Sequence, residues 1–169
     1  ALWLIFPIIF YAGIKYSGNS LTFLTTLITI YLSFPISLAG HIINDIFDYD
    51  IDKQNPRKHS FIYGAVVEPK YHKKLHIFAF ILAAPLFVMI WMTGSLVSLL
   101  SLFGIAFIAY FYGAPPIRLK DKGPLDSISN GIAYFFLTFL MGYAINGDLS
   151  VFPVQVYWLT FWVIGFHAL

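Results

Sequence analysis

The sequence predicts an all-α protein, a multi-span transmembrane helical bundle, from its composition and from the length of its apolar runs. Of its 169 residues, 59% are hydrophobic and 11% are charged, and its mean hydropathy is +0.78. Water-soluble domains carry about a quarter charged residues, so these proportions are typical of a protein that lies in a membrane. The apolar runs approach the length of about 20 residues that a helix needs to cross a bilayer.

We expect six membrane-spanning helices, and a tight turn around Gly94 separates the third from the fourth. The first is short, and the last runs to the final residue of the chain. In order they are Leu2–Ile14, Leu21–Ile43, Leu75–Thr93, Ser95–Ala114, Ile128–Ile145 and Phe152–Leu169. Residues 1–169 are therefore expected to form a single membrane domain. The sequence has no cysteine, which excludes disulfides and cysteine-based metal sites.

The distribution of charge predicts the orientation of these spans. Alternating spans would place residues 44–74 and 115–127 on the same side of the membrane. These two segments contain nine of the ten lysines and arginines and seven of the eight acidic residues, and the exceptions are Lys15 and Asp148. Because basic residues gather in cytoplasmic loops, we expect both segments to face the cytoplasm of a cell-membrane protein. We expect no nucleic-acid partner.

The most informative stretch follows the second predicted span and reads Asn44-Asp45-Ile46-Phe47-Asp48-Tyr49-Asp50-Ile51-Asp52; we call it the acidic motif. Carboxylates at the end of a membrane span are costly and usually functional. If the helix continues through them at about 100° per residue, four side chains share one face within roughly 12 Å of helix axis. The four are Asn44, Asp45, Asp48 and Asp52. Oxygen ligands arranged in this way suit Mg²⁺, which uses one or two carboxylates together with substrate phosphates.

Two questions about this face stay open from the residues alone. The acidic motif can also be a solvated helix end whose carboxylates lie near the membrane surface. His41 falls on the same face, one turn deeper in the membrane. A packed or hydrogen-bonded role is favoured for His41 over metal ligation.

A basic run, Lys53-Gln54-Asn55-Pro56-Arg57-Lys58, follows directly. One interpretation is a contact with anionic lipids, worth about 1 kcal/mol per basic residue. The functional interpretation is a phosphate clamp, in which the planar guanidinium of Arg57 and the ammonium of Lys58 bind phosphate oxygens. A diphosphate ligand would use both the Mg²⁺ site of the acidic motif and the cations of the basic run. The metal would bind its oxygens, and the cations would neutralise its remaining charge.

A second polar segment, Tyr112–Asp126, begins at the end of the fourth predicted span. Its Pro115-Pro116 pair predicts an extended chain at the exit of the span. In an extended chain Arg118, Lys120 and Lys122 would lie on one side. The alternative is an ordinary loop at the membrane interface.

Weaker predictions concern the start of the fifth span and the aromatic residues. Asp126 is expected to cap the first turn of that span, and the role of Asn130 is ambiguous. Aromatic residues make up 20% of the chain, and most are expected to face lipid or to pack. A few that line the bundle below the acidic motif can stabilise a carbocation through their ring quadrupoles. The candidates are Tyr110, Tyr112, Tyr134 and Phe135.

Together these segments resemble the UbiA-type intramembrane prenyltransferase superfamily. Asn44-Asp45-x-x-Asp48-x-x-x-Asp52 is similar to the first Asp-rich motif of that family. Tyr112–Lys120, reading Y-G-A-P-P-I-R-L-K, resembles the family stretch Y-S-x-P-P-x-R-x-K. The resemblance covers most of the chain and implies nine helices around a central cavity open laterally to lipid. It also implies Mg²⁺-dependent transfer of an isoprenoid chain from its diphosphate.

The resemblance implies roles for individual residues. Asn44, Asp48 and Asp52 would hold Mg²⁺, with Asp45 assisting as a fourth catalytic residue. The diphosphate would be bound by Arg57, Lys58, Arg118, Lys120 and Tyr112. In the family a second Asp-rich motif follows the sixth span, so we expect this chain to be the N-terminal portion of the enzyme, with six of its nine spans.

Residues 123–131 and 162–168 further resemble the lycopene elongase branch of carotenoid-modifying enzymes. The expected partners are a prenyl diphosphate, membrane lipid and a hydrophobic acceptor. A carotenoid such as lycopene is favoured as the acceptor, while an aromatic quinone precursor or a lipid alcohol stays open.

Two other functions remain as alternatives. A CDP-alcohol-type phospholipid transferase also collects aspartates at the end of a span, but its D-G-x-x-A-R lead-in is absent here. A non-enzymatic cation carrier would need polar residues at the middle of the bilayer, where these spans hold almost none.

Overall fold

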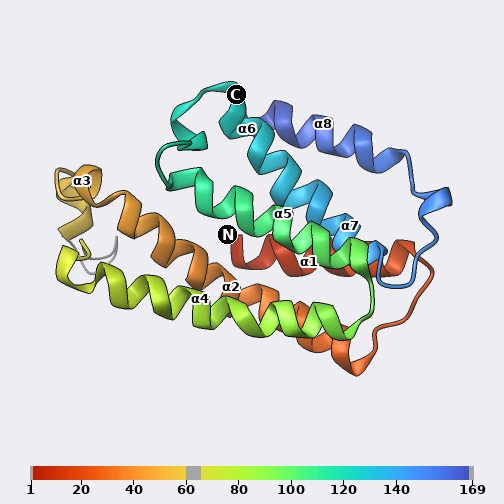
Figure 1. Ribbon diagram of the computed structural model, residues 1–169. Coiled ribbons are helices and arrows are strands. Elements are labelled where there is room, and N and C mark those ends of the chain that lie inside the picture. The colour runs from red at the N-terminus through yellow and green to blue at the C-terminus, as the bar shows by residue number, and fades with distance from the viewer. Residues whose placement is uncertain (1, 60–65, 168–169) are drawn as a thin grey trace.

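The computed structural model describes residues 2–59 and 66–167, and every regular element in these ranges is helical (Figure 1). The predicted all-α fold is therefore confirmed. The α-helices are α1 (Leu2–Tyr16), α2 (Phe23–Phe47), α3 (Tyr49–Asp52), α4 (Pro69–Met92), α5 (Leu96–Gly113), α6 (Pro124–Asn130), α7 (Thr138–Tyr143) and α8 (Gln155–His167). A π-helix, η3 (Gly131–Leu137), joins α6 to α7. Short 3₁₀ turns form η1 (Pro56–His59), η2 (Leu119–Asp121) and η4 (Leu149–Val151).

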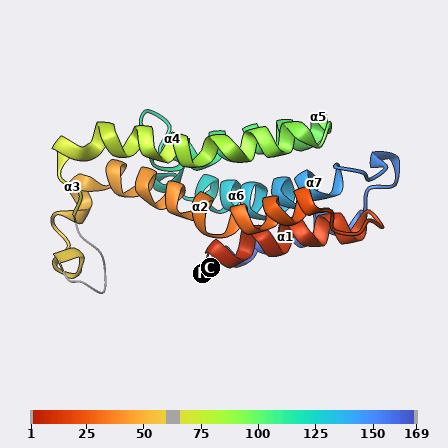
Figure 2. The same ribbon diagram turned by 90° about the horizontal axis from the view of Figure 1, so that it is seen from below.

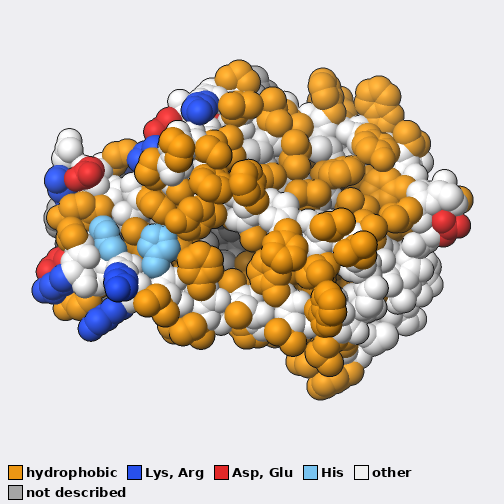
Figure 3. All heavy atoms as spheres, viewed as in Figure 1, with side chains coloured by type: hydrophobic (Ala, Val, Ile, Leu, Met, Phe, Trp, Pro, Cys, Tyr) orange, Lys and Arg blue, Asp and Glu red, His pale blue; other side chains and the backbone are white. Residues whose placement is uncertain are grey.

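Helices occur at each of the six predicted spans. By length and composition, α2, α4 and α5 can each cross a membrane, whereas α1 and α8 are shorter apolar helices. The fifth predicted span corresponds to the continuous run α6–η3–α7, and residues 168–169 of the sixth lie outside the described residues. α4 leaves large side chains such as Phe80 and Trp91 exposed, and hydrophobic side chains cover much of the face in Figure 3. Exposed apolar surface of this extent is typical of a contact with a membrane or with another protein, and the length of α2, α4 and α5 favours a membrane.

Capping side chains set the starts of two long helices. The Thr22 hydroxyl accepts a hydrogen bond from the Thr25 N–H (3.2 Å), and the Thr25 hydroxyl accepts one from the Thr22 N–H (2.8 Å). Gly94, with a φ of 74°, turns the chain between α4 and α5, which confirms the predicted tight turn. Ser95 then caps α5 and also donates to the Ala144 carbonyl oxygen (2.6 Å), which fastens α5 to the end of α7. Such caps typically contribute ~1 kcal/mol each.

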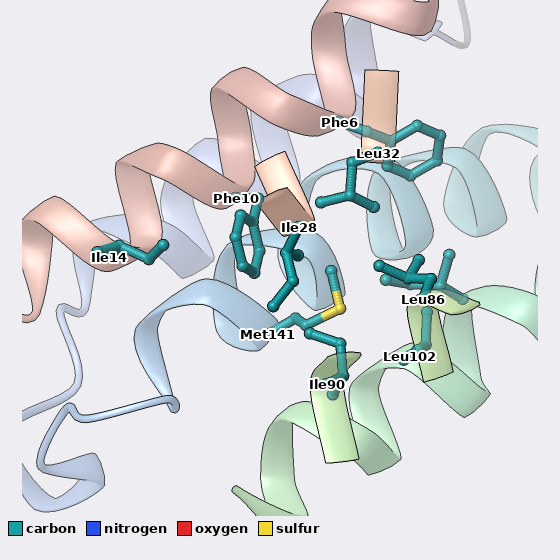
Figure 4. Packing of buried hydrophobic residues seen from close by; sticks show 10 residues of the cluster. Phe6, Phe10, Ile14, Ile28, Leu32, Leu86, Ile90, Leu102 and Met141 are labelled. Carbon is teal, nitrogen blue, oxygen red and sulfur yellow. The ribbon is translucent and has the colours of Figure 1, made fainter. Parts of the chain in front are cut away.

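α2 packs along both α1 and α4, while α7 packs against α1 and α5 (Figure 1, Figure 2). Figure 4 shows the core cluster where these helices meet, with Met141 reaching toward Ile28 and Ile90. The cluster consists of Phe6, Phe10, Ile14, Ile28, Leu32, Leu86, Ile90, Leu102, Ile105 and Met141. Because lipid tails are as apolar as these side chains, close packing rather than the hydrophobic effect favours this association.

The acidic motif does not continue α2 as one regular helix, which the prediction of a single face assumed. α2 ends at Phe47, and Asp48, with φ −94° and ψ 2°, separates it from the four-residue helix α3. The backbone N–H of Asp48 still donates to the Asn44 carbonyl oxygen (2.9 Å), and that of Asp52 donates to the Asp48 carbonyl oxygen (2.8 Å). The chain therefore bends at Asp48 without unwinding, and the carboxylates divide between two groups of cations.

Candidate functional site

Charged side chains gather at the end of the bundle that carries α3 (Figure 1, Figure 3). This end brings together the acidic motif, the basic run after it and the segment that follows α5. Segments about 70 residues apart in the sequence thus meet at one place. Sequence reasoning selected residues in all three segments.

Asp48 joins the acidic motif to the segment after α5. Its Oδ1 forms an ion pair with Lys120 Nζ and lies 3.7 Å from Arg118 Nη2. Arg118 also donates to the Phe47 carbonyl oxygen (3.5 Å) and, from Nε, to Asp121 Oδ2 (2.6 Å). The side chains of Asp48 and Lys120 are each 15% exposed. We call Asp48, Arg118 and Lys120 the Asp48 cluster.

Lys58 joins the other two carboxylates of the predicted face. Its Nζ lies 2.9 Å from Asp52 Oδ2 and 3.2 Å from Asp45 Oδ1. Burial opposes the charge on this ammonium, but its hydrogen bonds to Asp52 and Asp45 outweigh that cost, so the pKa of Lys58 is raised above its ordinary value. Lys58 is therefore fully charged at neutral pH. Its neighbour Arg57 lies exposed on η1.

The segment that carries Arg118 and Lys120 is a turn, and the predicted extended chain is wrong. The Arg118 N–H donates to the Ala114 carbonyl oxygen (2.9 Å), and η2 follows at once. Arg118 has a φ of 40°, in the left-handed region, which costs a non-glycine residue about 1–3 kcal/mol. This conformation directs Arg118 and Lys120 toward Asp48, while Lys122 is exposed. The predicted row of three cations on one side does not form.

Asp126 does not cap α6, and that prediction is also wrong. The N-cap residue is Gly123, and Asp126 lies inside the first turn. Its Oδ1 accepts hydrogen bonds from the Tyr112 hydroxyl (2.8 Å) and from Asn130 Nδ2 (2.9 Å), and Asn130 Nδ2 lies 3.4 Å from the Tyr112 hydroxyl oxygen. We call these three residues the polar triangle. The spacing of four between Asp126 and Asn130, which puts both on one helix face, was the signal in the sequence.

An apolar cavity of about 420 Å³ lies between α2, α4 and α5 and reaches the charged end. Figure 3 shows a hollow on this face, bordered by hydrophobic side chains. Its lining includes the polar residues Ser37, His41, Asn44, Tyr112 and Asn130. Leu86, Leu102 and Ile105 of the core cluster also line it. A volume of this size suits a small-molecule ligand.

Three of the polar lining residues, Ser37, His41 and Asn44, lie along one side of α2 from the interior to the charged end. Asn44 lies near α5, since a Cβ added at Gly113 would lie 3.9 Å from Asn44 Oδ1. His41 lines the cavity and is exposed rather than packed, while the preference against metal ligation by His41 stays a prediction. The Ser37 hydroxyl is buried and makes no hydrogen bond to any described residue.

Three of the four aromatic candidates line the cavity, namely Tyr110, Tyr112 and Tyr134. Tyr134 lies in the π-helix η3 and packs edge-on against Phe6 (ring centroids 5.1 Å apart). The fourth candidate, Phe135, packs instead against a second core cluster that contains Phe139. Irregular π-turns are common at functional sites, because they rotate side chains relative to the rest of the helix.

The donor chemistry of the acidic motif fits Mg²⁺, although no ready cage is present. Within residues 2–59 and 66–167, no three His, Asp or Glu side chains surround a common point. Asp45 and Asp52 nevertheless converge on one positive charge, the Lys58 ammonium. Two carboxylates that share one cation match the protein ligands that Mg²⁺ uses alongside phosphate oxygens. Asp48 is directed instead to Lys120 and Arg118.

The chain is similar to a known family of prenyltransferases along its whole length. The family model described as "UbiA prenyltransferase family" matches residues 1–169. A lycopene elongase/hydratase of Haloarcula japonica is 31% identical over 164 residues, covering 92% of this chain and 52% of the relative. The C(50) beta-cyclic carotenoids biosynthesis protein LbtBC of Dietzia sp. is 34% identical over 119 residues, covering 70% of this chain and 27% of the relative. A lycopene elongase/hydratase of Corynebacterium glutamicum is 30% identical over 118 residues, covering 70% of this chain and 40% of the relative.

The chain spans about half the length of the Haloarcula relative and less of the other two. No solved structure matches it.

Proposed function

We propose that this chain, which belongs to the UbiA prenyltransferase family, carries part of a Mg²⁺-dependent active site that transfers an isoprenyl group from a prenyl diphosphate to a hydrophobic acceptor. The observation that carries the proposal is the Asp48 cluster at the end of an apolar cavity. A prenyl diphosphate has the same two parts, a strongly anionic head and an apolar chain. The anionic head would bind at the charged end of the bundle, and the apolar chain would lie in the cavity.

In this proposal the basic side chains around the acidic motif bind the diphosphate. Arg118, Lys120 and Lys58 are already gathered there by carboxylates, and Arg57 is close to them in sequence. Asn44, Asp48 and Asp52, with Asp45, would hold Mg²⁺, which when bound supplies further positive charge to the diphosphate oxygens. As the allylic C–O bond breaks, negative charge grows on the leaving diphosphate, and Lys120 and Arg118 stabilise it in place.

The allylic cation that remains would lie in the cavity, among Tyr110, Tyr134 and aliphatic side chains. Aromatic faces attract a cation, and an apolar lining excludes the water that would quench it. An electron-rich acceptor then attacks the cation, and the positive charge that passes to the acceptor is lost as a proton. The names of the lycopene elongase/hydratase relatives support a carotenoid acceptor for this chain. The excess of basic residues in the two polar segments supports a place for the acidic motif on the cytoplasmic face of the cell membrane.

Turnover by the complete protein in lipid nanodiscs tests the proposal. With geranylgeranyl or dimethylallyl diphosphate and lycopene, we expect diphosphate release and a prenylated carotenoid when Mg²⁺ is present and neither when it is chelated. Release of no diphosphate from either donor would contradict prenyl transfer. Turnover of a CDP-alcohol, or ion flux through liposomes, would favour one of the two alternative functions instead.

A further inference from the structure

The polar triangle is a partly buried hydrogen-bonded network, and neither the resemblance nor the proposed function gives a role to its Asp126 or Asn130. Asp126 accepts from both Tyr112 (2.8 Å) and Asn130 (2.9 Å), which come from different helices, α5 and α6. Asn130 is only 6% exposed. Buried polar networks in a low-dielectric setting are costly unless they are satisfied, so a carboxylate here points to a function.

The triangle has an inner and an outer side relative to the cavity. Tyr112 and Asn130 line the cavity, whereas Asp126 does not. Asp126 therefore lies behind them, and the hydroxyl proton of Tyr112, which is donated to Asp126, is directed away from the cavity. The phenol oxygen also accepts a longer hydrogen bond from Asn130 Nδ2 (3.4 Å), which leaves one of its electron pairs for the cavity side.

The triangle also lies where the allylic C–O bond would break. Tyr112 immediately precedes Gly113, which packs against Asn44 and Phe47 at the end of α2. Six residues later the chain reaches Arg118 of the Asp48 cluster, which would hold the leaving diphosphate. Tyr112 thus stands between the place of the diphosphate and the apolar part of the cavity.

We propose, on the basis of the proposed function, that Asp126 is a positioning residue for prenyl transfer that acts through Tyr112. Its carboxylate holds the Tyr112 hydroxyl so that the phenol oxygen presents electron density to the cationic carbon as the C–O bond breaks. No proton is transferred: the electron pair of the C–O bond leaves with the diphosphate, and Tyr112 stays protonated. A hydrogen bond to a charged carboxylate polarises the phenol more than a bond to a neutral acceptor does.

Two substitutions in the complete protein test this role. Asp126→Asn keeps an acceptor oxygen for Tyr112 but removes the charge, and Tyr112→Phe removes the hydroxyl but keeps the ring. For each we expect kcat to fall about tenfold, while the Kd of geranylgeranyl thiodiphosphate, an unreactive donor analogue, stays within about twofold of wild type. The double variant should lose no more than either single one, because both changes interrupt the same interaction.

Asp148→Asn is the matched control, because Asp148 is the N-cap of η4 at the opposite end of the bundle and accepts a hydrogen bond from the Ser150 N–H. It should leave kcat unchanged. Wild-type kcat in Asp126→Asn, or in Tyr112→Phe, would overturn the inference, and so would strictly multiplicative losses in the double variant. If Asp126→Asn fails to fold, Tyr112→Phe alone decides, since full activity without the hydroxyl contradicts the proposed role. Absence of turnover in the wild-type protein would refute the proposed function itself, which separates the two failures.

Discussion

Asp48→Ala is expected to lower prenyl transfer by the complete protein about a thousandfold, equivalent to ~4 kcal/mol of transition-state stabilisation. Asp48 is a proposed metal ligand, and it also fixes Lys120 and Arg118, the cations proposed to bind the leaving diphosphate. Its removal therefore affects both sources of positive charge at once. Diphosphate release at saturating Mg²⁺ and geranylgeranyl diphosphate measures the effect.

Asp50→Asn is the matched control for this loss. Asp50 belongs to the same acidic motif, but its side chain is 83% exposed and pairs with Lys53 at 2.9 Å. We expect turnover close to wild type, because exposed ion pairs of this kind contribute little. Unchanged turnover in Asp48→Ala would refute the assignment of the acidic motif to the active site.

Gly142→Ala is expected to destabilise the bundle by about 3 kcal/mol or more. A Cβ at Gly142 of α7 would overlap the Phe10 carbonyl oxygen of α1, and a Cβ at Gly13 of α1 would overlap the Phe139 carbonyl oxygen of α7. The two helices thus approach through a reciprocal pair of glycines, as small residues allow in membranes. Backbone atoms cannot move aside as side chains can, so α1 and α7 would have to separate. Thermal unfolding in detergent should show a clearly lower midpoint.

Gly165→Ala controls for the general effect of adding a methyl group to a helical glycine. A Cβ there would meet no described atom within 4 Å. Alanine is the better helix former, so we expect an unchanged or slightly raised midpoint. Equal midpoints for Gly142→Ala and the wild-type protein would contradict the close α1–α7 contact.

Features with a strong local signal could be predicted from the sequence. The long apolar runs predicted α2, α4 and α5, and Gly94 predicted the turn between α4 and α5. The two polar segments could be singled out as parts of one site, because charges are rare and costly at the ends of membrane spans. In the structure Lys120 and Arg118 contact Asp48, which is consistent with the prediction that the two polar segments belong to one site.

Features that depend on contacts distant in sequence could not be predicted. Helical periodicity put Asn44, Asp48 and Asp52 on one face, but the bend at Asp48 directs Asp48 to the segment after α5 and Asp52 to Lys58. Proline favours extended chain locally, yet the segment turns so that Arg118 can reach Asp48 in a left-handed conformation.

Asp126 is a further case in which local sequence misleads. An aspartate at the start of a helix is usually a cap, because its carboxylate can accept from free backbone N–H groups. Here its oxygen accepts instead from Tyr112, a partner on another helix that only the folded arrangement supplies. The π-helix that begins immediately after Asn130 likewise has no clear signature in the sequence.

The central claim is that the Asp48 cluster binds the diphosphate head of a prenyl donor together with a divalent cation. The most direct test is calorimetric titration of the complete protein with geranylgeranyl thiodiphosphate, with and without Mg²⁺. The titration compares the affinities of the wild-type protein, Lys120→Met and Lys122→Met. Lys120 pairs with Asp48, whereas Lys122 is exposed two residues away in the same segment. We predict binding that requires Mg²⁺, weakens about tenfold or more in Lys120→Met and is unchanged in Lys122→Met. Equal affinity in the two variants, or binding indifferent to Mg²⁺, would contradict the claim.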